Sequence, residues 1–82
     1  MYFKSLNEMR PEEVVAEIKL FQNRRAYFEV LVNDLINKHK VNAVQAYSIL
    51  EQRAEELGLG TIYKSLDSFY MSRHRYAKER LQ

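Results

Sequence analysis

Apolar residues recur at steps of three, four or seven positions along the first half of this 82-residue chain, a spacing typical of an amphipathic helix. A strand would need apolar and polar residues in alternation, and no segment shows that pattern. Only two glycines and one proline interrupt the chain, so its helices can be long. The sequence therefore predicts a single all-α domain, in which one long N-terminal helix packs on two further helices.

The first helix is expected over residues 11–39. Pro11 suits the first helical position, because the N–H that proline lacks would have no partner there, and Glu12 and Glu13 complement the positive end of the helix. A helix of this length would extend for roughly 40 Å and overhang a compact domain with a radius of gyration of about 12 Å. Either the helix breaks near residues 22–25, or its free end pairs with another chain.

Pairing with another chain is the favoured alternative, because the apolar spacing lies near the repeat of a coiled coil. Arg25 interrupts this repeat, so the coil would be short. We therefore expect a homodimer, or a protein partner that completes a small core. The expected interface consists of Val14, Ile18, Phe21 and Phe28.

The second helix is expected over residues 42–57. Asn42 is a favourable N-cap, and Gln45 three residues later completes the pattern of a capping box. Gly58 supplies the left-handed residue that commonly ends a helix. Before the first helix, residues 1–9 are expected to form an arm or a short turn.

The third helix is expected over residues 61–81, with Thr61 as its N-cap. Residues 1–60 hold eight Lys and Arg against nine Asp and Glu, whereas residues 61–82 hold five against two, together with His74. The positive charge is therefore concentrated at the C-terminal end. Such asymmetry points to an acidic partner for this helix, although a solvated helix can be equally basic.

Composition excludes several classes of protein. A hydrophobic content of 46% and a charged content of 29% are those of a folded domain and not of a disordered chain. The chain has no cysteine, which excludes disulfides and thiolate sites and fits a reducing compartment. No apolar run is long enough for a signal peptide or a membrane span, so we expect a cytoplasmic protein without membrane contact.

Patterns for catalysis and metal binding are weak. His39 and His74 lie in different expected helices among basic residues, and no spacing places two metal ligands on one helical face. The segment Gly58-Leu59-Gly60 lacks the preceding strand and the third glycine of a phosphate-binding loop. We therefore expect no enzymatic activity, no metal and no cofactor.

Six tyrosines are many for a chain of this length. Tyr27, Tyr47 and Tyr63 lie on or beside apolar faces and are expected in the core, with the hydroxyl edge in water. Tyr70 and Tyr76 are interleaved with basic residues. These two rings could stack on unpaired bases of RNA or single-stranded DNA, or they could pack against the first helix.

Residues 54–59 and 61–66 look like the two halves of a bacterial repressor helix-turn-helix. Gly58 would then make the turn, and the helix that begins at Thr61 would lie in a major groove. An αα-corner that closes a helical core would use the same residues. Under the nucleic-acid hypothesis, the contacts to base edges and phosphates come from Lys64, Ser65, Ser68, Arg73, Arg75 and Lys78.

The segment from Arg25 to Ala54 resembles, without gaps, the ANTAR domain of bacterial antiterminators. The shared residues are Arg25, Leu35, His39, Ala46, Tyr47, Leu50 and Ala54. The resemblance implies binding to paired RNA hairpins and dimerisation through an upstream coiled-coil-like helix. The chain departs from the family at residues 31–33, where the family has Ala-Lys-Gly, and at Glu51, where it usually has Arg.

The leading hypothesis is a small dimeric nucleic-acid-binding protein that regulates transcription and contacts DNA or RNA phosphates through its basic C-terminal helix. The competing hypothesis is a helical protein-interaction module, such as an adaptor, a scaffold or an inhibitor, that completes its core on a protein partner. Exposure of Val14, Ile18 and Phe21 in a single chain would favour the second hypothesis.

Overall fold

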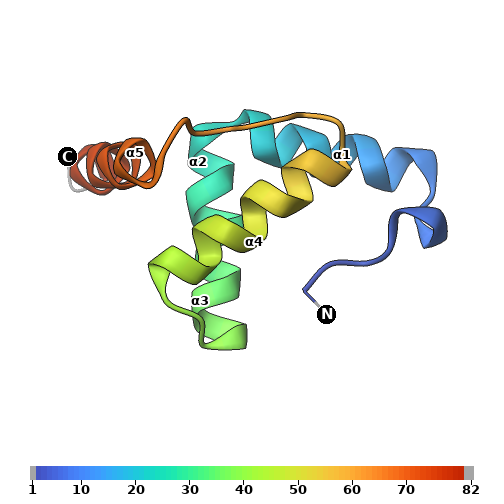
Figure 1. The fold of residues 1–82 in the computed structure, drawn as a ribbon, viewed down its shortest axis with the longest axis horizontal. Coiled ribbons are helices and arrows are strands. Elements are labelled where there is room, and N and C mark those ends of the chain that lie inside the picture. Colours follow the sequence, from blue (N-terminus) through green and yellow to red (C-terminus); the bar gives the residue numbers. More distant parts are fainter. Residues whose placement is uncertain (1, 81–82) are drawn as a thin grey trace.

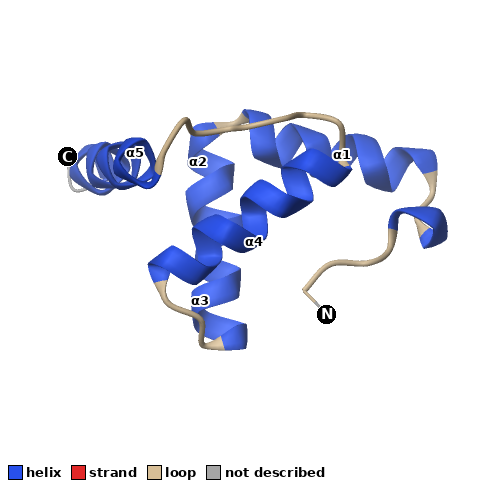
Figure 2. Cartoon of the chain, in the orientation of Figure 1, coloured by secondary structure: helices blue, strands red, loops and turns tan. Residues whose placement is uncertain are grey.

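The structure is a computed structural model that describes residues 2–80; Met1, Leu81 and Gln82 lie outside the described residues. Its elements, in chain order, are the 3₁₀ turn η1 (Leu6–Glu8), α1 (Pro11–Gln22), α2 (Arg24–Ala26), the π-helical segment η2 (Tyr27–Val32), α3 (Asn33–His39), α4 (Ala43–Glu56) and α5 (Leu66–Arg80). Figure 2 shows helices and loops but no strand within residues 2–80, so the expected all-α fold is confirmed.

The helices are arranged along one long axis of the molecule. The principal extents are 38 × 23 × 22 Å. Figure 1 shows α1 and the N-terminal arm at one end and α5 at the other, with α4 crossing the segment formed by α2, η2 and α3 between them. The two ends of the molecule therefore offer separate surfaces.

The helix expected over residues 11–39 is interrupted at Asn23. The backbone of Asn23 is extended, with φ −110° and ψ 113°. Its side-chain oxygen accepts a hydrogen bond from the N–H of Ala26 at 3.1 Å, so Asn23 caps a new helix. That helix then continues through α2, η2 and α3 to His39. The prediction of one continuous helix is wrong, and the alternative of a break within residues 22–25 is correct.

A single core fills the space between η2, α4 and α5. Among the described residues, twelve buried apolar side chains form it: Phe21, Tyr27, Phe28, Leu31, Val32, Leu35, Val41, Ala46, Leu50, Ala54, Phe69 and Tyr76. Tyr27 is in the core as expected, but its hydroxyl is buried and has no hydrogen-bond partner within residues 2–80, so the expected wet edge is absent there. Tyr47 and Tyr63 are half-buried at the margin of the core.

The expected dimer or partner interface is largely part of this core. Phe21 is 3% exposed and Phe28 is 1% exposed, so neither can contact a second chain without unfolding. Val14 and Ile18 are half-buried on α1. The prediction that these four residues form an interface is therefore wrong for the two phenylalanines. Phe21 before the break at Asn23 and Phe28 after it lie in one intramolecular core instead.

Both ends of α4 follow the sequence signals. Asn42 and Gln45 form the capping box, with side chain-to-backbone hydrogen bonds of 2.8 and 2.9 Å. At the other end, Gly58 has φ +79° and donates to the carbonyl of Glu55, while Leu59 donates to the carbonyl of Ala54. These two bonds form a Schellman motif, which needs a left-handed residue at the position of Gly58.

The third helix begins later than expected. α5 starts at Leu66, and Ser65, not Thr61, caps it by accepting a hydrogen bond from the N–H of Ser68 at 3.2 Å. Residues 57–65 form a long connection without a helix, which Figure 1 shows running across the molecule from α4 to α5. The tight turn of a helix-turn-helix expected between Gly58 and Thr61 is therefore absent. The expected end of the helix at residue 81 lies outside the described residues.

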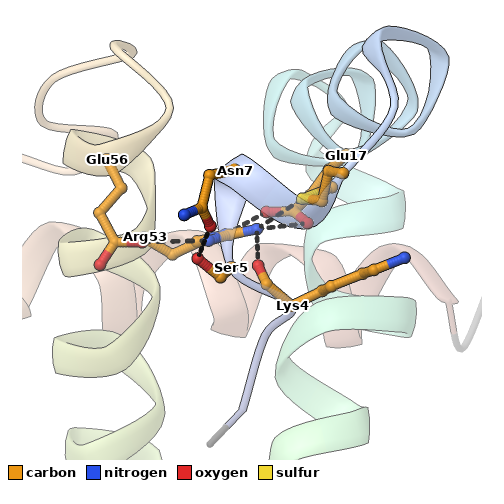
Figure 3. A network of polar contacts seen from close by, with 7 residues as sticks. Lys4, Ser5, Asn7, Glu17, Arg53 and Glu56 are labelled. Carbon is orange, nitrogen blue, oxygen red and sulfur yellow. Dashed lines mark hydrogen bonds and ion pairs between the residues drawn. The ribbon is translucent and has the colours of Figure 1, made fainter.

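A buried arginine fastens the N-terminal arm to the helices. Arg53 on α4 is only 3% exposed. Its guanidinium forms a two-pronged ion pair with Glu17 on α1, and a further hydrogen bond joins it to Glu56 at 3.0 Å. Figure 3 shows these carboxylates on either side of Arg53, with the carbonyl of Lys4 below it.

The same guanidinium also holds the arm directly. Nη2 of Arg53 donates to the carbonyl oxygen of Lys4 at 2.9 Å and lies 3.2 Å from the sulfur of Met9. The ring of Phe3 lies with its centroid 5.1 Å from the guanidinium carbon, within the range of a cation–π interaction. One side chain of α4 therefore joins α1 and residues 3–9.

We predict that the Arg53→Met variant is strongly destabilised. Removal of one partner from a buried ion pair leaves the other charge uncompensated, which costs about 3–5 kcal/mol of unfolding free energy. Urea denaturation measures this loss. The double variant Arg53→Met/Glu17→Leu should recover much of the stability, because no buried charge then remains. Equal stability of the single and double variants would contradict the proposed pairing.

Candidate nucleic-acid interface

Aromatic packing positions α5 against the rest of the domain. The rings of Phe28 and Tyr76 are stacked with centroids 5.4 Å apart, and the rings of Tyr47 and Phe69 lie 5.1 Å apart. Tyr76 is therefore a core residue, and the hypothesis that it stacks on a nucleic-acid base is wrong. The alternative of packing against the first half of the chain is correct for this ring.

The connection that precedes α5 is anchored by Glu51. Its two carboxylate oxygens accept hydrogen bonds from the backbone N–H groups of Ile62 at 3.2 Å and Tyr63 at 2.9 Å. The Tyr47 hydroxyl adds a bond to the carbonyl of Tyr63 at 3.4 Å, and the Tyr63 hydroxyl lies 3.1 Å from Oγ of Ser72 on α5. Glu51 thus fastens the connection to α4 at Ile62 and Tyr63.

One side of α5 faces solvent along the whole helix. It consists of Asp67, Tyr70, Met71, His74, Arg75 and Lys78, and we call it the outer face of α5. These residues are three, four or seven positions apart, so they share one side of the helix. Tyr70 is 39% exposed and Met71 is 59% exposed, so both belong to the six large apolar side chains that are exposed within residues 2–80.

The structure separates the residues that the sequence proposed as phosphate contacts. Arg75 and Lys78 lie on the outer face of α5, and Lys64 is exposed in the connection before it. Arg73 is half-buried and lies roughly 200° around the helix from Arg75, because successive residues are about 100° apart. Ser68 is half-buried and its hydroxyl lies 3.3 Å from that of Ser65. The six expected residues therefore do not form one surface.

An ion pair brings a further basic segment to α5. Nη2 of Arg24 contacts both carboxylate oxygens of Glu79, at 2.7 and 2.6 Å. Arg24 and Arg25 therefore lie beside the last turns of α5. The two adjacent arginines are visible in the sequence. Which side of the domain they face depends on whether the first helix is straight or broken.

Two residues with structural roles escaped the sequence analysis. Arg53 lies seven positions after Ala46 and three after Leu50, on the apolar face of α4, and a charged residue at such a position indicates a buried pair. Glu51 was noted only as a departure from the antiterminator family. Its role as an acceptor for two backbone N–H groups depends on the path of a loop, for which the sequence has no signal.

Within residues 2–80, no three His, Cys, Asp or Glu side chains are grouped so that they could hold a metal ion. None of the helices in that range is long and apolar enough to cross a membrane. Comparison with known protein families, with curated proteins and with solved structures finds no match to this chain.

We predict that Glu51→Ala loosens the connection to α5. Two N–H groups lose their acceptor, and unsatisfied buried groups cost about 1–3 kcal/mol each. We expect a lower free energy of unfolding and faster amide hydrogen exchange at Ile62 and Tyr63. Glu55→Ala, at an exposed glutamate one turn further along α4, is the matched control. Equal exchange rates in the two variants would contradict the anchoring role.

Proposed function

We propose that this chain is a small nucleic-acid-binding regulatory protein that uses the outer face of α5, together with Lys64, to contact DNA or RNA. The observation that supports the proposal is the placement of Arg75 and Lys78 beside the exposed side chains of Tyr70 and Met71 on one solvent-facing side of a helix. The surface comes from a single chain, so the proposal does not depend on a dimer.

The chemistry of this face suits a polynucleotide. Lys and Arg release counterions when they neutralise phosphates, which gives sequence-independent affinity that falls steeply with salt. An exposed aromatic ring can stack on an unpaired base, and this interaction tolerates any base. Tyr70 therefore favours single-stranded DNA, or the loop of an RNA hairpin, over a regular duplex. The resemblance to the antiterminator domain also makes hairpin RNA the first RNA probe to use.

A protein-interaction module is the second candidate. It is supported by an open groove of about 600 Å³ between the N-terminal arm and α4. Its apolar walls come from Tyr2, Phe3, Leu6 and Ile49, with Arg53 as a polar wall. The interface first expected for such a partner is weakened, because Phe21 and Phe28 are in the core.

We predict that Arg75→Ala/Lys78→Ala weakens binding to nucleic acid and lowers the salt slope, the change of log K with log salt concentration, by about two. Fluorescence anisotropy against duplex DNA, single-stranded DNA and hairpin RNA measures both quantities between low and physiological salt. The matched control is Lys19→Ala/Lys38→Ala, which removes two exposed positive charges from α1 and α3. Binding of wild type to none of the three probes at low salt would refute the proposal and leave the groove as the candidate site.

We predict a separate effect for Tyr70→Ala. Loss of base stacking should weaken binding to single-stranded DNA or hairpin RNA by about 1–3 kcal/mol and leave binding to duplex DNA unchanged. The same anisotropy titrations measure this difference. Met71→Ala, the adjacent exposed apolar residue, is the control for loss of apolar surface alone. An equal loss in both variants, or an equal loss on duplex DNA, would contradict base stacking by Tyr70.

A further inference from the structure

A polar cleft lies between the start of α2 and the end of α5. Its volume is about 270 Å³, and it is lined by Asn23, Arg24, Arg25, Glu29, Tyr76, Glu79 and Arg80. We propose that this cleft, named here the α2–α5 cleft, binds a phosphate group. The α2–α5 cleft is distinct from the outer face of α5, because Tyr76, which lines the cleft, is buried against the domain, whereas the residues of the outer face are exposed.

The charge of the α2–α5 cleft favours an anion. Three guanidinium groups meet two carboxylates there. Arg24 is paired with Glu79, and Nε of Arg25 lies 3.2 Å from the carboxylate of Glu29. Within residues 2–80, Arg80 forms no ion pair. One positive charge therefore remains uncompensated among the described groups.

The two ion pairs would yield to a phosphate at little cost. Arg24 and Glu79 are both largely exposed, as is Arg25, and exposed ion pairs contribute little to stability. A phosphate carries more charge than a carboxylate and accepts forked hydrogen bonds from arginine. Exchange of carboxylate for phosphate would leave Glu29 and Glu79 free to face solvent. The carboxylates of Glu29 and Glu79 thus hold Arg24 and Arg25 in place at the cleft, as a phosphate would.

A buried hydroxyl supplies the second observation. Tyr76 is only 9% exposed, and its hydroxyl has no hydrogen-bond partner within residues 2–80. Burial, and then the nearby carboxylate of Glu29, raise the pKa of the Tyr76 hydroxyl, so it stays a donor at neutral pH. The Glu29 carboxylate lies next to this hydroxyl and contributes to the raised pKa, but by distance and angle no group within residues 2–80 completes a hydrogen bond with it. A buried donor without an acceptor is rare, and a phosphate oxygen would satisfy it.

The size of the α2–α5 cleft limits the ligand. Sites for drug-sized molecules range from about 300 to 1,000 Å³, so this cleft suits a single phosphate group and the atoms next to it. The group could belong to the end of a nucleic-acid strand or to a free nucleotide. The phosphate site stands independently of the proposed function, because inorganic phosphate alone is a sufficient probe.

The test is an NMR titration of the full chain with inorganic phosphate at constant ionic strength. We expect saturable shifts of the side-chain N–H signals of Arg24, Arg25 and Arg80. Tyr76→Phe should weaken this binding about tenfold, since a hydrogen bond to a charged acceptor is lost. Its melting temperature should not fall, because the hydroxyl has no hydrogen-bond partner within residues 2–80. Arg80→Ala should also weaken binding and leaves the Arg24–Glu79 pair in place.

The control is Arg75→Ala/Lys78→Ala, which should bind phosphate like wild type. Shifts that do not saturate, or that are unchanged in both Tyr76→Phe and Arg80→Ala, would overturn the phosphate site. Phosphate binding in a protein that binds no polynucleotide would uphold this site and refute the proposed function. Polynucleotide binding by a protein that does not bind phosphate would refute the phosphate site alone.

The source of the phosphate is resolved by three further probes: adenosine monophosphate, a short single strand with a 5′-phosphate, and the same strand without it. Tighter binding of the phosphorylated strand than of the other two would support the end of a nucleic-acid strand as the ligand. Equal binding of the mononucleotide and the phosphorylated strand would support a free nucleotide. Equal binding of the two strands, with no effect of Tyr76→Phe on either, would overturn the preference for a terminal phosphate.

Discussion

The buried guanidinium of Arg53 is the contact on which the arrangement of the N-terminal half depends. A charge removed from water is costly unless its hydrogen bonds are satisfied, so Arg53 constrains every group near it. Glu17 fixes the position of α1 relative to α4, and the carbonyl of Lys4 fixes the path of the arm. Apolar packing alone would tolerate other positions of α1, because it has no direction. The Arg53–Glu17 ion pair has a required geometry, so it selects one position of α1 on α4.

A second polar anchor lies on another side of α4. Glu51 and Arg53 are two residues apart on α4, and they point to different sides of the helix. Arg53 holds the arm and α1, whereas Glu51 holds the connection to α5 through two backbone N–H groups. One short helix therefore positions both outer parts of the chain. This arrangement lets an 82-residue domain build two surfaces while its core stays small.

The position of α5 determines how its basic residues can act. Phe69 and Tyr76 face the core, so Arg75 and Lys78 must face solvent, and Arg73 must face the body of the domain. A basic helix that looks uniform in sequence is thereby divided into two parts. The outer face carries two positive charges beside an exposed ring, and the inner edge contributes to the α2–α5 cleft. The first part suits a backbone of many phosphates, and the second suits a single phosphate.

The sequence by itself determined the helical class, the buried side of α4 and the ends of α4. Apolar spacing places Leu50 and Ala54 inward whatever the rest of the chain does, and the caps at Asn42 and Gly58 depend only on neighbouring residues. The break at Asn23, the late start of α5 and the burial of Phe21 and Tyr76 were decided by the tertiary structure. The physical reason is that a side chain such as Asn23 can cap a new helix or leave the backbone helical at similar local cost, and a side chain such as Glu51 acts on a segment far away in the sequence. Long-range contacts, such as those of Arg24 with Glu79 and of Phe28 with Tyr76, then select one of these conformations.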